Sequence, residues 1–280
     1  MERIWICGSN GRLGKALEHH LNPIDAEIIS TDIDTLDVSD CDEVILFARR
    51  NRPTVIINCA GVTNHQYCQD HPEEAYRVNG LGARNVAVAA QLINAQLIHL
   101  STDQVFGQHI DGPCKECDQA SPLSIFGKSK LFGEEMVSRV CPHHFIIRTS
   151  WLYSNENHMV EKVLEKAKKN EVISISRTAI GSPTSAYALS LFIIQLMKSH
   201  EYGVYHASCE GYCSQREFTE KILENAGLTA QLKEVEDYSD QIFRPKSVAL
   251  ENFILNISDI YQFPTWQETL ADYMTHNGLM

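Results

Sequence analysis

Two short stretches of the sequence contain side chains that can act on a carbonyl group. Ser101-Thr102-Asp103 follows an apolar run, and Phe126 and Lys130 lie four residues apart farther along the chain. Residues at this spacing share one face of a helix, so the ring of Phe126 and the amine of Lys130 are predicted to be neighbours. The Thr102 hydroxyl can hold a carbonyl oxygen, and a lysine can tune a nearby acid. Phe126 itself has no proton to give.

A glycine-rich turn lies near the start of the chain, between an apolar run and a helical pattern. Gly8, Gly11 and Gly14 have the spacing GxxGxxG. Glycines at such a turn permit a tight bend, close backbone approach to a pyrophosphate and close packing of helix on strand. The N–H groups at the helix start then bind the anion. The turn therefore predicts dinucleotide binding by Gly8, Asn10, Gly11, Arg12, Leu13 and Gly14.

An acidic residue, Asp32, ends the second apolar run, where a carboxylate binds the 2′-hydroxyl of the adenosine ribose. This position favours NAD(H) as cofactor. NADP(H) stays open, because Arg12 in the glycine turn could reach a 2′-phosphate. Asp37 and Val38 are predicted to flank the adenine, although Asp37 equally suits the start of a helix.

The elements that must position these residues alternate between strand and helix. Apolar runs predict strands at 3–7, 27–31, 54–58, 96–100 and 144–148, and helical patterns occupy 13–21, 41–51, 73–92 and 124–140, with a break near 78–80. Strict alternation indicates an α/β fold with a Rossmann-type doubly wound parallel sheet. Cys59-Ala60-Gly61 and Ser101-Thr102-Asp103 then end two strands at the edge where such sheets bind ligands, and the first trio is predicted to line the cofactor.

The second half of the chain is less regular and predicts a smaller C-terminal substrate-binding lobe. Helices are expected at 158–170, 185–198, 214–226 and 266–276, short strands at 173–175 and 204–206, and a loop-rich stretch at 228–250. We divide the chain into an NAD(P)-binding domain, 1–150, and the lobe, 151–280. Within the lobe, about 184–207 is expected to pack back on the first domain.

Composition narrows the classes of partner. The formal net charge of −12 disfavours nucleic acid and anionic membranes. No signal peptide or membrane-spanning run is recognised, and nine cysteines, an odd number, suit a reducing cytoplasm. Cys114 and Cys117 form a CxxC, but the downstream pair, Cys209 and Cys213, has a different spacing. No metal site is therefore predicted.

Several strings extend these expectations to a known family. GSNGRLG, NRPTVIINCAG, EEAYRVNGLGARNVA, LIHLSTDQVF, SPLSIFGKSKLFGE, IIRTSWLY, GSPTS, GVYHAS and RPKSVAL follow one another over nearly the whole length. In these strings the chain resembles the dTDP-4-dehydrorhamnose reductase family, a branch of the extended short-chain dehydrogenases/reductases. The resemblance implies an oxidoreductase of dTDP-rhamnose biosynthesis. Such an enzyme uses NAD(P)H to reduce a nucleotide-activated 4-keto-deoxysugar, and a homodimer is left open.

The resemblance also implies roles for individual residues. Thr102 and Lys130 correspond to active-site residues, and Phe126 stands where the family has its proton-donor tyrosine. Lys130 also binds the nicotinamide ribose, and Asn79 belongs to the cofactor site. The residues implied around the sugar nucleotide are Asp103, Trp151, Tyr153, Pro183, Thr184 and Arg244. Trp151 and Tyr153 could instead be core aromatics, and Arg244 a surface loop residue.

Departures from the family pattern gather around the substrate. They are Phe126, Gln104 in place of a second tyrosine, the segment 63–69, Thr178-Ala179 and Cys114. Two hypotheses follow: a reductase of low or altered activity, or a catalytically silent regulatory or sugar-nucleotide-binding protein. A substitute proton donor could be His65, Tyr67, Tyr153 or a water held by Thr102. His65 is interpreted as a surface loop residue.

Overall fold

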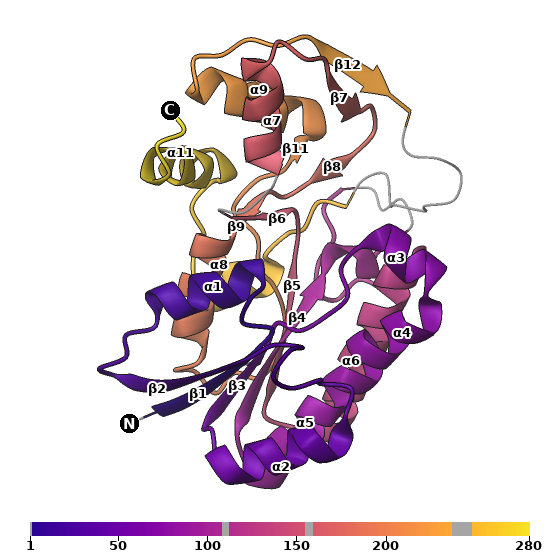
Figure 1. The fold of residues 1–280 in the computed structure, drawn as a ribbon, viewed down its shortest axis with the longest axis vertical. Helices are drawn as coiled ribbons and strands as arrows, with labels where there is room; N and C mark the ends of the chain where they lie inside the picture. Colours follow the sequence, from indigo (N-terminus) through magenta and orange to yellow (C-terminus); the bar gives the residue numbers. More distant parts are fainter. Residues whose placement is uncertain (1, 108–111, 155–158, 237–247) are drawn as a thin grey trace.

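The structure is a computed structural model that describes residues 2–107, 112–154, 159–236 and 248–280. A large sheet flanked by helices forms one part of the molecule, and a smaller lobe lies beyond one edge of that sheet (Figure 1). All helices and strands named below lie within these described residues.

The central sheet has six strands in the order β10-β5-β4-β3-β1-β2, and every neighbouring pair is parallel. The strands are β1 (Glu2–Cys7), β2 (Ala26–Thr31), β3 (Val55–Asn58), β4 (Gln96–Thr102), β5 (His144–Thr149) and β10 (Gly203–His206). The predicted α/β class with a doubly wound parallel sheet is confirmed, and each predicted strand begins within one residue of its observed start.

Helices cover both faces of the sheet, and β1 illustrates why consecutive residues in the middle of its strands are apolar. Ile4 and Ile6 belong to the core that includes residues of α1 (Arg12–His20) and α8 (Ala186–Leu196). Trp5 and Cys7 point into the opposite core. That second core is covered by α2 (Cys41–Asn51), α5 (Ala83–Ile93) and α6 (Ile125–Val140). Alternate residues therefore enter different cores, and a period-2 pattern is absent.

The helical stretch expected at 73–92 consists of three consecutive pieces. These are α4 (Pro72–Tyr76), a π-helical turn η1 (Arg77–Gly82) and α5. A side chain at Gly80 would place its Cβ 2.3 Å from the ring of Phe132 on α6, so only glycine permits this close approach. The break predicted near 78–80 is therefore a π-helical turn that presses against α6.

The remaining elements are two short pieces that pack beside α6, given first, and those that build the smaller lobe and its connections. They are the 3₁₀ turn η2 (Asp103–Val105), α3 (His65–Asp70), β6 (Leu152–Tyr153), α7 (Met159–Lys168), β7 (Ile173–Ser176), β8 (Ile180–Gly181), β9 (Thr184–Ser185), β11 (Cys213–Ser214), α9 (Gln215–Asn225), β12 (Leu232–Val235), α10 (Phe253–Ser258) and α11 (Trp266–His276). Two elements from the second half of the chain return to the sheet: α8 packs on α1, and β10 pairs with β5. The boundary between 1–150 and 151–280 stays a prediction.

The expectation that His65 lies in a loop was wrong, whereas the stretch expected to be loop-rich, 228–250, contains one short strand. The segment 63–69 contains helix α3, whose start is fixed by the Asn64 side chain accepting a hydrogen bond from the Tyr67 amide at 2.9 Å. The stretch 228–250 contains β12, which pairs in parallel with β7. Within the described ranges, no helix combines the length and apolar character needed to cross a membrane.

Candidate active site

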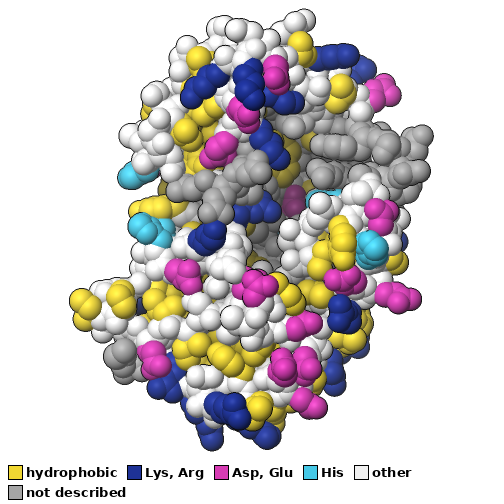
Figure 2. All heavy atoms as spheres, viewed as in Figure 1, with side chains coloured by type: hydrophobic (Ala, Val, Ile, Leu, Met, Phe, Trp, Pro, Cys, Tyr) yellow, Lys and Arg dark blue, Asp and Glu magenta, His cyan; other side chains and the backbone are white. Residues whose placement is uncertain are grey.

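A pocket of about 510 Å³ lies between the carboxyl edge of the sheet and the smaller lobe. In Figure 2 the surface is hollowed between these two parts of the molecule. Twelve of the predicted site residues line it: Gly11, Arg12, Leu13, Cys59, Ala60, Gly61, Thr102, Asp103, Phe126, Lys130, Trp151 and Tyr153. Residues far apart in the sequence therefore meet around one space.

The glycine turn forms one wall through its backbone. Gly8 has φ +76°, and a Cβ there would lie 2.7 Å from the amide nitrogen of Ala60, so any side chain would force apart the ends of β1 and β3. Helix α1 begins after Gly11 without a side-chain cap. Its first amides are thus free of a capping side chain, as the binding of a pyrophosphate requires. The local geometry fits a dinucleotide.

Several predicted cofactor residues lie beside or behind this wall. The Asp32 carboxylate accepts hydrogen bonds from the amides of Asn10 at 2.9 Å and Ile33 at 2.8 Å, which fixes it next to the turn. Val38 is buried, and the Asp37 carboxylate accepts from the amide of Ser39 at 2.8 Å. These residues, together with Gly8 and Gly14, are not part of the pocket wall.

Asn79 is buried behind the loop that follows β3. Its amide nitrogen donates to the Val62 carbonyl at 3.0 Å and to the Ser129 hydroxyl at 2.9 Å, and its oxygen accepts from the Val62 amide at 2.8 Å. The side chain is 1% exposed. Its visible role is therefore to hold the loop carrying Gly61 against α6.

The side chain of Arg12 crosses the pocket to the smaller lobe. Its guanidinium donates to the carbonyl oxygen of Leu152 at 2.6 Å. Partial burial lowers the pKa of this group. The Arg12 side chain, which had kept NADP(H) open, is thus directed at the lobe in this structure.

Thr102 and Asp103 form a buried hydrogen-bonded unit at the end of β4. The Thr102 hydroxyl donates to one carboxylate oxygen of Asp103 at 2.8 Å, and the Ser150 hydroxyl donates to the other at 2.8 Å. Burial raises the pKa of Asp103 to about 6, although both hydroxyl contacts lower it. The single hydroxyl proton of Thr102 is given to Asp103 here, so Thr102 can donate to a carbonyl oxygen only when its hydroxyl turns away from that carboxylate.

Lys130 projects from α6 into the same site. Its ammonium donates to the carbonyl oxygen of Leu100, and burial lowers the pKa of Lys130 to about 8, against the opposing effect of Glu134. Glu134 forms a buried ion pair with Arg148 at 2.7 Å and also accepts from Ser101. This network fixes α6 to the ends of β4 and β5.

Phe126 lies on the pocket wall, on the same helix as Lys130. Its side chain is 7% exposed and belongs to a small cluster with Cys68 and Ala75. The ring of His65 meets it edge-on, with ring centroids 4.8 Å apart. His65 is thus the first residue of α3 and part of the pocket wall, which corrects its interpretation as a surface loop residue.

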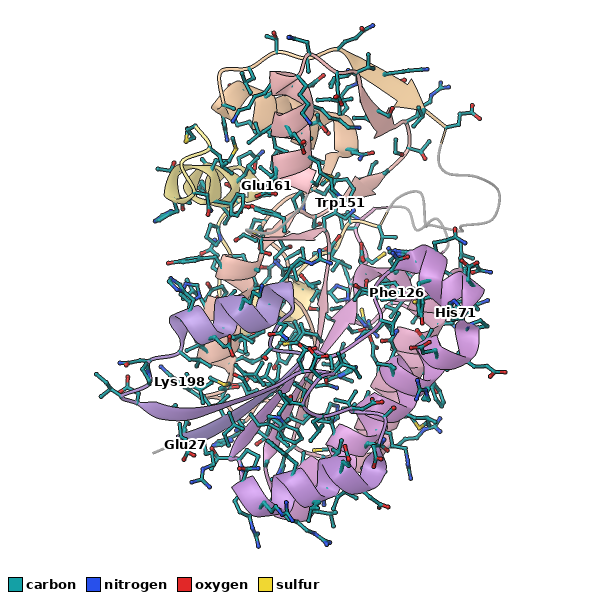
Figure 3. The ribbon with its side chains drawn as sticks, viewed as in Figure 1. Glu27, His71, Phe126, Trp151, Glu161 and Lys198 are labelled. Atoms are coloured by element: carbon teal, nitrogen blue, oxygen red, sulfur yellow. The ribbon has the colours of Figure 1, made fainter. Side chains whose placement is uncertain are left out.

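The lobe contributes side chains to the opposite wall, and Figure 3 shows Trp151 across the site from Phe126. Trp151 lines the pocket with φ 39°, a backbone conformation rare for a large side chain. Tyr153 lines it as well, yet its hydroxyl lies 3.2 Å from the Thr269 hydroxyl in the core. Pro183 and Thr184 are buried away from the pocket, and Arg244 lies outside the described residues.

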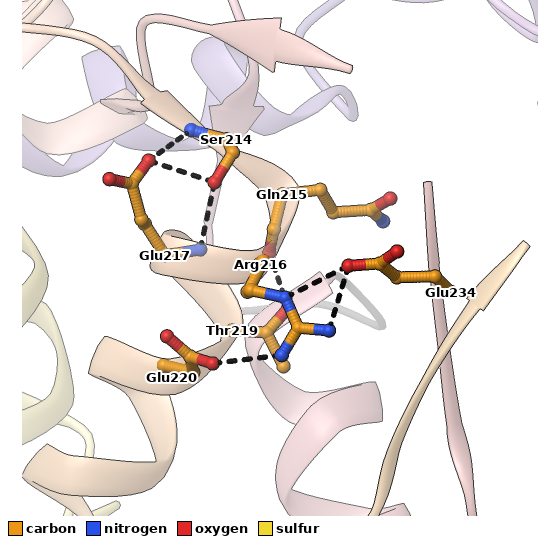
Figure 4. A network of polar contacts seen from close by, with 7 residues as sticks. All are labelled: Ser214, Gln215, Arg216, Glu217, Thr219, Glu220 and Glu234. Atoms are coloured by element: carbon orange, nitrogen blue, oxygen red, sulfur yellow. Dashed lines mark hydrogen bonds and ion pairs between the residues drawn. The ribbon is translucent and has the colours of Figure 1, made fainter. Parts of the chain in front are cut away.

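Sequence reasoning missed several lining residues from the lobe, of which Gln215 is the best defined. It is the first residue of α9, after the capping box of Ser214 and Glu217. Figure 4 shows this cap and the ion pairs of Arg216 with Glu220 and Glu234, at 3.1 and 3.0 Å. The helix predicted at 214–226 already placed Gln215 in a first helical turn, in agreement with the S-x-x-E pattern, but nothing in the sequence places that start at the pocket.

The cysteines could bind a metal ion only if several ligands gathered at one place. All nine are free; Cys114 is buried and Cys117 exposed. Among the residues that the structure describes, no three His, Cys, Asp or Glu side chains gather as metal ligands would. The prediction that the protein holds no metal rests on the sequence spacing.

Comparison with known proteins identifies the family that this fold and site define. The sequence profile of the RmlD substrate binding domain family matches residues 1–278, and the chain belongs to that family. The spore coat polysaccharide biosynthesis protein SpsK of Bacillus subtilis (strain 168) is 32% identical over 277 residues, covering 98% of this chain and 97% of the relative.

Two further relatives carry the enzyme name. The dTDP-4-dehydrorhamnose reductase of Aggregatibacter actinomycetemcomitans is 30% identical, covering 97% of this chain and 98% of that protein. The crystal structure of dTDP-4-dehydrorhamnose reductase from Bacillus anthracis str. Ames, in complex with NADP, is 36% identical, with a TM-score of 0.95 and coverage of 98% and 99%. The resemblance drawn from the sequence is therefore confirmed.

Proposed function

We propose that this protein is an NAD(P)H-dependent reductase of a nucleotide-activated 4-keto-deoxysugar, with activity lowered or altered by the loss of a phenol at Phe126. The observation that carries the proposal is the meeting of Thr102, Lys130 and the glycine turn around one pocket. The reductase relatives support the same reaction and a sugar-nucleotide substrate.

The dinucleotide would lie along the glycine turn and the loop of Cys59-Ala60-Gly61. Once bound, the reduced nicotinamide supplies the hydride for the carbonyl carbon. Lys130 would hold the nicotinamide ribose, and Thr102 would hold the sugar carbonyl oxygen through its hydroxyl. Trp151 and Gln215 would contact the sugar nucleotide from the lobe. The relative bound to NADP supports a dinucleotide cofactor, whereas the position of Asp32 favours NAD(H).

A second candidate function follows from Phe126. A site whose ring carries no hydroxyl could bind the cofactor and the sugar nucleotide without turnover and act as a regulatory protein. The scattered cysteines and net charge of −12 support a cytoplasmic location without nucleic-acid or membrane partners. A homodimer remains a prediction, to be checked by analytical ultracentrifugation.

The test compares the wild type with Phe126→Tyr. Quenching of protein fluorescence measures NADH and NADPH binding, and loss of absorbance from the reduced cofactor measures reduction of dTDP-4-dehydrorhamnose. A phenol beside Lys130 should raise turnover by about 10²-fold, since a positioned general acid contributes about 10²–10⁴-fold. If both proteins bind the cofactor and neither consumes it with this substrate, the regulatory candidate replaces the reductase.

A further inference from the structure

The pocket contains an ionisable ring next to the missing phenol. His65 and Phe126 both line the pocket, and their rings meet edge-on with centroids 4.8 Å apart. They come from different elements, α3 and α6, which pack against each other. An imidazole therefore lies one ring away from the position where a phenol would give its proton.

The two tyrosines considered as substitute donors are engaged elsewhere. The Tyr67 hydroxyl donates to Glu74 at 2.6 Å, which raises the pKa of Tyr67, and this side chain is not on the pocket wall. The Tyr153 hydroxyl is buried against Thr269, and burial raises the pKa of Tyr153 far above its ordinary range. Neither hydroxyl is available to a substrate in the pocket.

We propose that His65 is the proton donor of the reduction, a role that rests on the proposed reductase function. In this step the carbonyl carbon accepts the hydride from the reduced dinucleotide, which is oxidised. The π bond of the carbonyl breaks, and its oxygen takes a proton from the imidazolium of His65. The product is an alcohol, and the neutral imidazole regains a proton from water.

Histidine suits this task because its ordinary pKa, about 6.5, keeps a useful share of both protonation states near neutral pH. The ring has a second advantage of position. Phe126 covers one side of it, the imidazole Nε2 atom is buried, and the half-buried His65 residue borders the pocket. The ring is thus held by packing instead of being free to rotate in solvent.

Other ionisable groups around His65 must be separated from it in any pH profile. Those that line the same pocket from other elements are Lys130 on α6, Asp103 on η2, Cys59 after β3, Arg12 on α1 and Tyr153 on β6. Those on α3, on the facing helix α4 and elsewhere on α6 are Tyr67, Cys68, Asp70, Glu73, Glu74, Tyr76, Lys128, Glu134, Glu135 and Arg139. A variant at His65 removes its own titration and leaves all of these in place.

The experiment compares His65→Gln with His71→Gln, the same chemical change six residues along, outside the pocket (Figure 3 labels His71). Wild-type turnover of dTDP-4-dehydrorhamnose should fall about tenfold per unit as pH rises above the histidine pKa. His65→Gln should lose about 10–10²-fold of turnover and this fall with pH, while NADPH binding stays unchanged. His71→Gln should match the wild type.

Two more measurements make the result specific. The double variant His65→Gln/Phe126→Tyr should recover turnover, because it moves the donor back to α6. The imidazole pKa of His65, measured by NMR with cofactor bound, should coincide with the pKa of the turnover profile. If His65 had only a structural role, the double variant would not recover turnover and the two pKa values would not coincide.

The outcomes separate two failures. If the wild type reduces the keto-sugar and His65→Gln retains both its turnover and its pH profile, His65 is not the donor and the reductase function stands. If the wild type binds NADPH but reduces no keto-sugar nucleotide, both proposals fall. Should His65→Gln not fold, His65→Asn is measured in its place, with cofactor binding as the criterion of folding.

Discussion

The two walls of the pocket are built in different ways. The cofactor side is a backbone surface, formed by the glycine turn and by Ala60 and Gly61. The substrate side is a surface of side chains, among them His65, Trp151 and Gln215, contributed by elements distant in the sequence. A backbone surface tolerates almost no change at its closest contacts, whereas a wall of side chains can be rebuilt by single substitutions. Of the departures from the family pattern, Thr63, His65, Gln104, Phe126 and Ala179 line the pocket, whereas Cys114 is buried in a separate small core.

Gly8→Ala should give the largest effect, because it breaks the backbone wall. The new Cβ would adopt an unfavourable positive φ and lie 2.7 Å from the Ala60 amide nitrogen. Together, left-handed strain of about 1–2 kcal/mol and overpacking of about 1–3 kcal/mol should lower the free energy of unfolding. Urea unfolding measures the loss, and fluorescence should show that cofactor binding is abolished.

A matched control is available at Gly227, which has φ +61° and no neighbour within 4 Å of a Cβ. Gly227→Ala should cost only the strain of about 1–2 kcal/mol and leave cofactor binding intact. Equal losses for the two variants would show that the contact between the ends of β1 and β3 adds nothing to the cofactor wall.

The Thr102–Asp103 unit lies between the two walls, and its buried carboxyl makes stability depend on pH. Asp103 ionises at about 6 in the folded protein and near its ordinary value, about 4, when unfolded. The folded state therefore holds the proton more strongly. This contribution to stability is fully present below about pH 4 and is lost as pH rises through about 6.

Asp103→Asn removes that titration and keeps the shape of the side chain. The stability of the variant relative to wild type should improve by up to about 3 kcal/mol between acidic and neutral pH, because two pKa units correspond to about that free energy. Urea unfolding of both proteins below about pH 4 and above about pH 6 measures it. A constant difference across this range would mean that Asp103 ionises in the folded protein as it does in the unfolded chain.

The same contrast explains what the sequence could predict. Glycine spacing, apolar runs and strand ends are local features, and they placed the sheet, the turn, Thr102 and Lys130 correctly in the fold. The positions of His65 and Gln215 depend on how α3 and α9 pack. Asn64 and Ser214 cap these helices and are readable as caps, yet no local pattern tells which pocket a helix start will face.

The roles of buried residues could not be predicted from the sequence either. Pro183, Thr184 and Asn79 occur in strings of the family, and a string does not tell whether a side chain faces a ligand or supports the wall behind it. Asn79 uses both ends of its amide within the protein. Thr184 donates to the Ser182 carbonyl at 3.0 Å and accepts from the Cys209 amide at 3.3 Å. Such networks depend on contacts across long sequence separations.

The smallest expected effect concerns the choice of dinucleotide on the backbone wall. The Asp32 carboxylate lies beside the turn, held by the amides of Asn10 and Ile33, where it would accept a ribose hydroxyl and repel a 2′-phosphate. Asp32→Asn removes the charge and keeps one acceptor oxygen, which can serve one of these two amides. The ratio of NADPH to NADH affinity should then rise about tenfold, the equivalent of about 1.4 kcal/mol. Asp34→Asn, at an exposed neighbour, removes the same charge from the surface and should leave the ratio unchanged. Fluorescence titrations with both cofactors give the ratio directly. If Asp32→Asn leaves it unchanged, the carboxylate serves only to shape the turn, and the NADP bound by the relative from Bacillus anthracis becomes the better guide to the cofactor of this protein.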